Sequence, residues 1–195
     1  LVQQLGTSLY GVIGYSMGGR LALYFAATFP HSVRRLVLES ASPGLRTEEE
    51  QKARRQHDEA LAQRLENTPF DEFLDGWYNQ PLFASLRAHP DFDRILAQRR
   101  INTPAGLARS LRQMGTGSQP SMWETLASLP VPTVLLAGQR DEKFVRIGRE
   151  ITHLLPSAPL CVIAGAGHTL HVENEDVYTD VVRTFLTAPG IPENI

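Results

Sequence analysis

The feature that most restricts the fold of this chain is a serine set among glycines, Gly14-Tyr15-Ser16-Met17-Gly18. It follows a short apolar run over residues 9–14 and precedes a helical pattern over residues 20–27. Glycines at both ends of the motif permit a strained turn that lifts the serine hydroxyl out of the sheet. The helix N-terminus then directs backbone N–H groups at the same point. We therefore predict a reactive Ser16 with the Met17 N–H as an oxyanion donor, the alternative being a glycine-rich turn with an ordinary capping serine.

Three further apolar runs predict strands over residues 33–39, 133–137 and 160–164. The runs are continuous rather than alternating, which is typical of parallel strands covered on both faces. Helical patterns follow the last two strands, over residues 145–155 and 176–186. The order of strands and helices predicts a parallel α/β sheet.

Residues 44–128 interrupt this alternation, because they are helical in pattern and dense in charge. We interpret them as a helical lid inserted into a core that is formed by residues 1–43 and 129–195. Thr47 and Glu50 have the spacing of a capping box at the start of the first lid helix. Most of the charged side chains in this segment are expected to form a solvated helical surface.

Composition narrows the class of protein. Nineteen Lys and Arg against 21 Asp and Glu give a net charge of -2 over 195 residues, which argues against a nucleic-acid partner. The single cysteine, Cys161, excludes an internal disulfide or a cysteine-based metal site and favours a reducing, cytoplasmic compartment. No apolar run approaches the length that spans a bilayer, so we expect no membrane partner.

A serine hydroxyl needs a histidine to accept its proton and a carboxylate to orient that histidine. Asp141 lies just past the third predicted strand, and His168 lies just past the fourth. The chain order Ser, Asp, His is that of the α/β-hydrolases. Two alternatives remain open: Glu39, which ends the second strand, as the acid, and His171 as the histidine.

Two other positions could line the same cleft. Arg20 lies four residues after Ser16, and an arginine buried near a nucleophile usually holds a carboxylate, either of the protein or of a substrate. Trp77 and Tyr78 could line the pocket from the lid, although an aromatic pair at this spacing is also typical of core packing.

Several segments together resemble one branch of the α/β-hydrolase superfamily, the MenH family of 2-succinyl-6-hydroxy-2,4-cyclohexadiene-1-carboxylate synthases of the menaquinone pathway. The serine turn alone is common to many esterases, whereas the lid segments are far more specific. The resemblance covers essentially the whole chain. It rests on residues 14–20 (GYSMGGR), 39–45 (ESASPGL), 77–86 (WYNQPLFASL), 114–120 (MGTGSQP) and 165–169 (GAGHT).

The resemblance implies a lyase that removes pyruvate from 2-succinyl-5-enolpyruvyl-6-hydroxy-3-cyclohexene-1-carboxylate without a metal or organic cofactor. Ser16 would act as the base, His168 would receive its proton, and Asp141 would orient the imidazole. Arginines would hold the several carboxylates of this substrate. By position, the substrate-contacting residues would be Tyr15, Arg20, Arg54, Trp77 and Arg100, with Arg99 as the alternative to Arg100.

The chain departs from this family at its start. The early strands of the family, and the loop that supplies a second oxyanion donor, have no counterpart here. Residues 1–5 resemble the last turn of a helix stopped by Gly6. We therefore expect residues 1–195 to be the C-terminal part of a longer protein, with a missing N-terminal segment completing the sheet. The competing hypotheses are a general esterase or C–C hydrolase of a small acidic substrate, and a non-catalytic remnant that binds a ligand or partner.

Overall fold

The computed structural model describes residues 10–189, and within them four parallel strands form one sheet. Strand order along the sheet follows chain order, and every neighbouring pair is parallel. The predicted helix end at residues 1–5 lies outside the described residues, as does the first residue of the predicted strand 9–14. The four strands are β1 (Tyr10–Tyr15), β2 (Val33–Glu39), β3 (Thr133–Gly138) and β4 (Leu160–Ile163).

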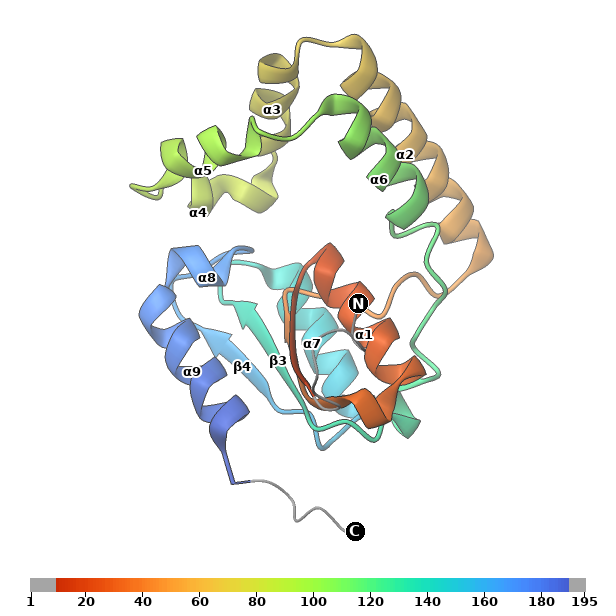
Figure 1. The fold of residues 1–195 in the computed structure, drawn as a ribbon, viewed down its shortest axis with the longest axis vertical. Helices are drawn as coiled ribbons and strands as arrows, with labels where there is room; N and C mark the ends of the chain where they lie inside the picture. Colours follow the sequence, from red (N-terminus) through yellow and green to blue (C-terminus); the bar gives the residue numbers. More distant parts are fainter. Residues whose placement is uncertain (1–9, 190–195) are drawn as a thin grey trace.

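Both faces of this sheet are covered by helices, which explains why the strands are apolar without alternation. Helices α1 (Met17–Thr28) and α7 (Glu142–Leu154) pack on one face, and α9 (Glu175–Thr187) packs on the other (Figure 1). Successive strand residues divide between the two layers: Leu36, Leu38 and Leu135 join the α1 and α7 cluster, whereas Val37, Val134 and Leu136 join the α9 cluster. The parallel α/β sheet predicted from the sequence is therefore present.

Strand β1 forms one edge of the sheet in the part of the chain that the structure describes. Its register with β2 runs from Tyr10 opposite Val33 to Tyr15 opposite Glu39. The side chain of Ile13 on this strand is 48% exposed, although an interior strand of such a sheet is normally covered. A segment that completes the sheet at this edge stays a prediction.

Residues 44–128, the lid segment, are helical as predicted. The lid helices are α2 (Glu48–Asn67), α3 (Phe70–Tyr78), α4 (Ala84–Arg87), α5 (Phe92–Arg99) and α6 (Pro104–Met114). Helices α2 and α6 lie side by side, and α3, α4 and α5 form a second group near the short helix α8 (Leu170–Glu173) (Figure 1). Short 3₁₀ helices occur at η2 (Pro30–Ser32), η3 (Pro81–Phe83) and η4 (Leu126–Ser128). The division of the chain into core and lid domains stays a prediction.

Hydrogen bonds cap the first lid helix and hold the two ends of the lid segment together. The predicted capping box is present at the start of α2, where Thr47 and Glu50 satisfy each other's backbone N–H groups. The segment's two ends meet, because the Met122 N–H donates to the Pro43 carbonyl at 2.7 Å and the Trp123 indole donates to the Gly44 carbonyl at 3.0 Å. No helix within residues 10–189 is long and apolar enough to cross a membrane.

Candidate active site

Ser16 occupies a strained turn between β1 and α1. Its φ of 50° lies in the left-handed region, which residues other than glycine rarely adopt. Two backbone hydrogen bonds hold it there: the Ser16 N–H donates to the Glu39 carbonyl at 2.9 Å, and the Arg20 N–H donates to the Ser16 carbonyl at 3.1 Å. The first bond extends the sheet and the second begins the helix, so the serine is held where the two elements meet.

The glycines that this turn needs are Gly14 and Gly19. A Cβ at Gly14 would lie 2.6 Å from both the Gly18 carbonyl oxygen and the Gly19 Cα, and a Cβ at Gly19 would lie 2.9 Å from the Gly14 carbonyl oxygen. Gly18 stands at the other end of the motif, but a Cβ there would meet no atom within 4 Å in the described part of the chain. Glycine is therefore required where the strand and the helix pack closely, at Gly14 and Gly19, and not at both ends of the motif.

The structure brings Ser16, His168 and Asp141 together. His168 Nε2 lies 3.1 Å from Ser16 Oγ, and His168 Nδ1 lies 2.6 Å from Asp141 Oδ2. The second contact favours the tautomer in which Nδ1–H donates to the carboxylate, leaving Nε2 free to accept the serine proton. Asp141 Oδ1 also accepts the Phe144 N–H at 3.3 Å at the start of α7. The carboxylate is thus oriented by the helix that follows it.

A single carboxylate organises the loop that carries His168. Glu173 Oε2 accepts the Gly167 N–H at 2.6 Å, and Oε1 accepts the Thr169 N–H at 3.0 Å, so the two amides flanking the histidine are fixed by one side chain. The loop is also tied to the turn that follows β3, because the Arg140 N–H donates to the Ala166 carbonyl at 2.9 Å. These contacts position the imidazole without touching it. No motif in the sequence predicts this role for Glu173, whose only local signal is its position five residues after His168.

The alternative acid and the alternative histidine pair with each other. Glu39 is only 1% exposed, and its Oε1 lies 2.8 Å from His171 Nδ1 and accepts the His171 backbone N–H at 3.2 Å. The buried carboxylate is therefore already occupied by the start of α8. The geometry favours Asp141 and His168 for the roles predicted from the sequence.

Tyr15 lies between the two histidines. Its ring is 5.4 Å from that of His168 and 5.0 Å from that of His171, and its hydroxyl is 3.1 Å from Thr169 Oγ1. Burial raises the pKa of Tyr15, so its hydroxyl stays neutral at physiological pH. Tyr15 borders a cavity of about 250 Å³ between the core and α5, which Arg99 also lines.

Arg20 is buried where α1 meets the end of α6. Its Nη2 donates to the Met114 carbonyl at 3.3 Å, and its Nη1 donates to the Thr116 hydroxyl. Burial, and to a smaller extent the positive charge of Arg54, lowers the pKa of Arg20 to about 10, so the group remains a cation at neutral pH. Arg20 is thus a buried positive charge close to the serine turn.

The other predicted contact residues belong to the lid segment, where the Arg54 and Arg100 side chains are 38% and 48% exposed. Arg54 Nε donates to Asp58 Oδ1 at 2.8 Å, and the Trp77 ring packs 5.9 Å from that of Phe83. Arg100 instead bonds to Asp71 at 2.6 Å on the surface. Because Arg99 lines the Tyr15 cavity, the geometry favours Arg99 over Arg100, and the role of each stays a prediction.

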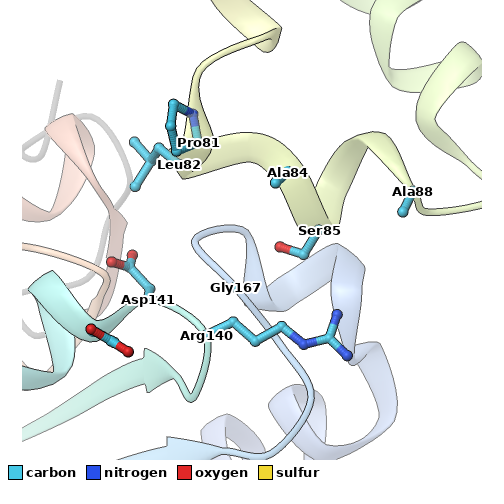
Figure 2. A pocket seen from close by; sticks show the side chains of 9 residues that line it. Pro81, Leu82, Ala84, Ser85, Ala88, Arg140, Asp141 and Gly167 are labelled. Carbon is cyan, nitrogen blue, oxygen red and sulfur yellow. The ribbon is translucent and has the colours of Figure 1, made fainter.

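A second cavity, of about 450 Å³, lies between the lid segment and the loops that carry Asp141 and Gly167 (Figure 2). In Figure 2 the Ser85 side chain points from the lid towards the loop at Gly167. A lid residue thus adjoins the loop that carries the histidine, a relationship that no local sequence pattern indicates. The cavity is lined by Pro81, Leu82, Ala84, Ser85, Ala88, Arg140, Asp141, Glu142 and Gly167.

The fold and the geometry of Ser16, His168 and Asp141 define a protein of the α/β-hydrolase class, and a family model described as the alpha/beta hydrolase fold matches residues 1–175. A Bacillus subtilis protein assigned as a 2-succinyl-6-hydroxy-2,4-cyclohexadiene-1-carboxylate synthase is 43% identical, with 96% of this chain and 69% of the relative aligned. The synthase of Serratia proteamaculans is 34% identical, over 97% of this chain and 72% of its own length. This chain belongs to the 2-succinyl-6-hydroxy-2,4-cyclohexadiene-1-carboxylate synthase family.

A solved structure agrees with this assignment. The structure of MenH from S. aureus superposes with a TM-score of 0.85 at 39% sequence identity. The alignment covers 89% of this chain and 66% of that structure, so this chain spans slightly less than two thirds of the solved protein. The family resemblance noted in the sequence is therefore confirmed.

Proposed function

We propose that this chain carries the catalytic centre of a lyase that eliminates pyruvate from 2-succinyl-5-enolpyruvyl-6-hydroxy-3-cyclohexene-1-carboxylate. The product is the 2,4-cyclohexadiene for which the relatives are named. The observation that carries the proposal is the contact of Ser16 Oγ with His168 Nε2 at 3.1 Å, in a chain of this family. The same contact would serve a hydrolase, so the substrate distinguishes the two activities.

The substrate has one ring proton that is acidic enough for this pair. It lies on C2, next to the ketone of the succinyl group. Ser16 takes this proton as its own hydroxyl proton passes to His168, and Asp141 stabilises the resulting imidazolium. The C2–H electrons form the C2=C3 bond, the C3=C4 electrons move to C4=C5, and the bond from C5 to the enolpyruvyl oxygen breaks. The leaving enolate takes a proton and becomes pyruvate.

Negative charge develops on the succinyl ketone oxygen as the C2 proton leaves. We propose that the N–H of Met17, the first residue of α1, stabilises this charge. We expect a second donor from a segment that lies beside β1 at the edge of the sheet, because the relatives extend beyond the span of this chain. Loss of one such donor costs about 100- to 1,000-fold in rate, so this segment would matter for activity.

The substrate carries carboxylates on the ring, the succinyl arm and the enolpyruvyl group, and we propose that the arginines bind them. Arg20 is a buried cation one helical turn after Ser16, and Arg54 acts on it electrostatically from α2. Planar guanidinium groups clamp carboxylates in a fixed orientation, which would hold C2 over the serine hydroxyl. Tyr15, Trp77 and Arg99 or Arg100 would complete the contacts. The cytoplasmic location favoured by the single cysteine remains a prediction.

Pyruvate release tests the proposal. The enolpyruvyl substrate is mixed with the chain, pyruvate is measured with lactate dehydrogenase, and Ser16→Ala is the matched control because the substrate also decomposes on its own. A rate clearly above that of Ser16→Ala supports the lyase. Equal rates, together with hydrolysis of small esters that Arg54→Ala does not alter, would favour the general hydrolase. Equal rates without labelling of Ser16 by a fluorophosphonate would favour the non-catalytic remnant.

A further inference from the structure

A buried carboxylate in the lid segment lies next to the proposed arginine clamp. Asp58, one turn after Arg54 on α2, is only 2% exposed. Its Oδ1 accepts the Arg54 Nε–H at 2.8 Å, whereas its Oδ2 is buried and has no hydrogen-bond partner among the described residues. Burying a carboxylate with only half of its capacity satisfied is costly. Helix packing alone therefore does not explain why a carboxylate is buried at this position.

Three segments converge on this carboxylate. Arg54 approaches from α2 itself, and the backbone of Gly115 approaches from the end of α6, where a Cβ would lie 3.1 Å from Asp58 Cγ. Arg20 of the core is bonded to Thr116, the residue after Gly115. The charge of Asp58 raises the pKa of Arg20, opposing the effect of Arg54. Two guanidinium groups and one carboxylate thus leave one net positive charge here.

Other side chains also join α2 to α6. Arg112 of α6 bonds to Glu59 at 2.8 Å and to Glu66 at 2.6 Å, so it joins the helices from the surface. Ala62, Leu65 and Ala108 fill the space between the two helices. An apolar side chain at position 58 would serve this interface at least as well as a buried charge.

We propose that Asp58 is a positioning residue that orients Arg54 to bind a carboxylate of the substrate. This inference rests on the proposed function. The bond to Asp58 uses Nε at the side of the guanidinium group, so the two terminal amino groups lie outside this bond and can form the two-point contact that a carboxylate accepts. The negative charge also allows Arg20 and Arg54 to lie near each other before substrate arrives. Asp58 itself does not touch the substrate.

The test compares Asp58→Asn with Arg54→Ala and with the double variant. We expect Asp58→Asn to raise KM, and the inhibition constant for succinate, by about tenfold, with kcat changed less than about threefold. Because Asp58 acts through Arg54, the Asn substitution should add nothing in the Arg54→Ala background. The matched control is Asp180→Asn, which removes an exposed i,i+3 partner of Arg183 on α9.

The possible results separate this inference from the proposed function. If Arg54→Ala raises KM but Asp58→Asn behaves like Asp180→Asn, the positioning role is wrong and the clamp stands. Asp58→Asn effects that persist undiminished without Arg54 would show a structural role and would also overturn the inference. If Arg54→Ala itself leaves KM and succinate inhibition unchanged, the clamp in the proposed function is wrong. Should Asp58→Asn fail to fold, Asp58→Ser gives the same comparison with a smaller side chain.

Discussion

His171 Nδ1 lies 2.8 Å from Glu39 Oε1, so the two side chains that compete with His168 and Asp141 for their roles are paired with each other. The two carboxylates lie at the ends of neighbouring strands of the parallel sheet, since Glu39 ends β2 and Asp141 follows β3, whereas both histidines follow β4. Tyr15 stands between the two imidazoles and contacts both. The site therefore contains one histidine–carboxylate pair directed at Ser16 and a second that anchors α8.

Substitution of Asp141 should mainly reduce kcat, whereas substitution of Glu39 should mainly reduce stability. Asp141→Asn should lower kcat by about 10⁴-fold, because the imidazole loses the partner that fixes its tautomer. Glu39→Gln should lower kcat less than about tenfold but destabilise the fold by about 1–3 kcal/mol, because a buried hydrogen-bonded pair is disturbed. Pyruvate release and urea unfolding measure the two effects. A larger kcat loss in Glu39→Gln than in Asp141→Asn would reverse the assignment.

The strained backbone at Ser16 should lower the stability of the fold. A residue other than glycine held at a φ of 50° costs about 1–3 kcal/mol. Ser16→Gly and Ser16→Ala both remove the hydroxyl and should both be inactive, but only glycine relieves the strain. We expect Ser16→Gly to be more stable than Ser16→Ala by about 1–2 kcal/mol in urea unfolding. Equal stabilities would contradict a strained turn.

Adjacent glycines of α1 should respond differently to alanine. Gly19→Ala places a Cβ against Ala41 and 2.9 Å from the Gly14 carbonyl oxygen, and should destabilise the fold by about 2 kcal/mol or more. Gly18→Ala meets no atom of residues 10–189 within 4 Å and should be neutral or stabilising by up to about 1 kcal/mol, because alanine favours the helix. Thermal unfolding of the two variants checks this. Similar losses at both positions would refute the packing argument.

Glu173 should affect the rate without contacting the substrate. Glu173→Gln can accept only one of the two amides at Gly167 and Thr169, so the loop that carries His168 loses one of its two ties. We expect kcat to fall by about 10- to 100-fold with little change in KM, because a small displacement of a catalytic group is costly. Asp176→Asn, an exposed change at the start of α9, is the control. If the two variants have equal kcat values, Glu173 does not position the histidine.

Local sequence patterns predicted most of the fold. The strand and helix positions follow from apolar runs, glycines and prolines, because each is a local property of a few residues. Strand β2 begins and ends where the pattern places it, and the capping box at Thr47 begins α2. Ser16, Asp141 and His168 could also be predicted from the sequence, since the carboxyl ends of parallel strands share one edge of a sheet.

Tertiary structure alone decided which side chains pair across that edge and across the lid. Glu39 and Asp141 both follow strands, and only the folded chain assigns one to His171 and the other to His168. Asp58 has the same i,i+4 spacing from Arg54 whether it is exposed or buried, so its burial depends on residues more than fifty positions away, at the end of α6. The sequence by itself determined the elements and the serine turn, because these depend on near neighbours. The partners of the buried charges were decided by the tertiary structure, because desolvation depends on every segment that packs around them.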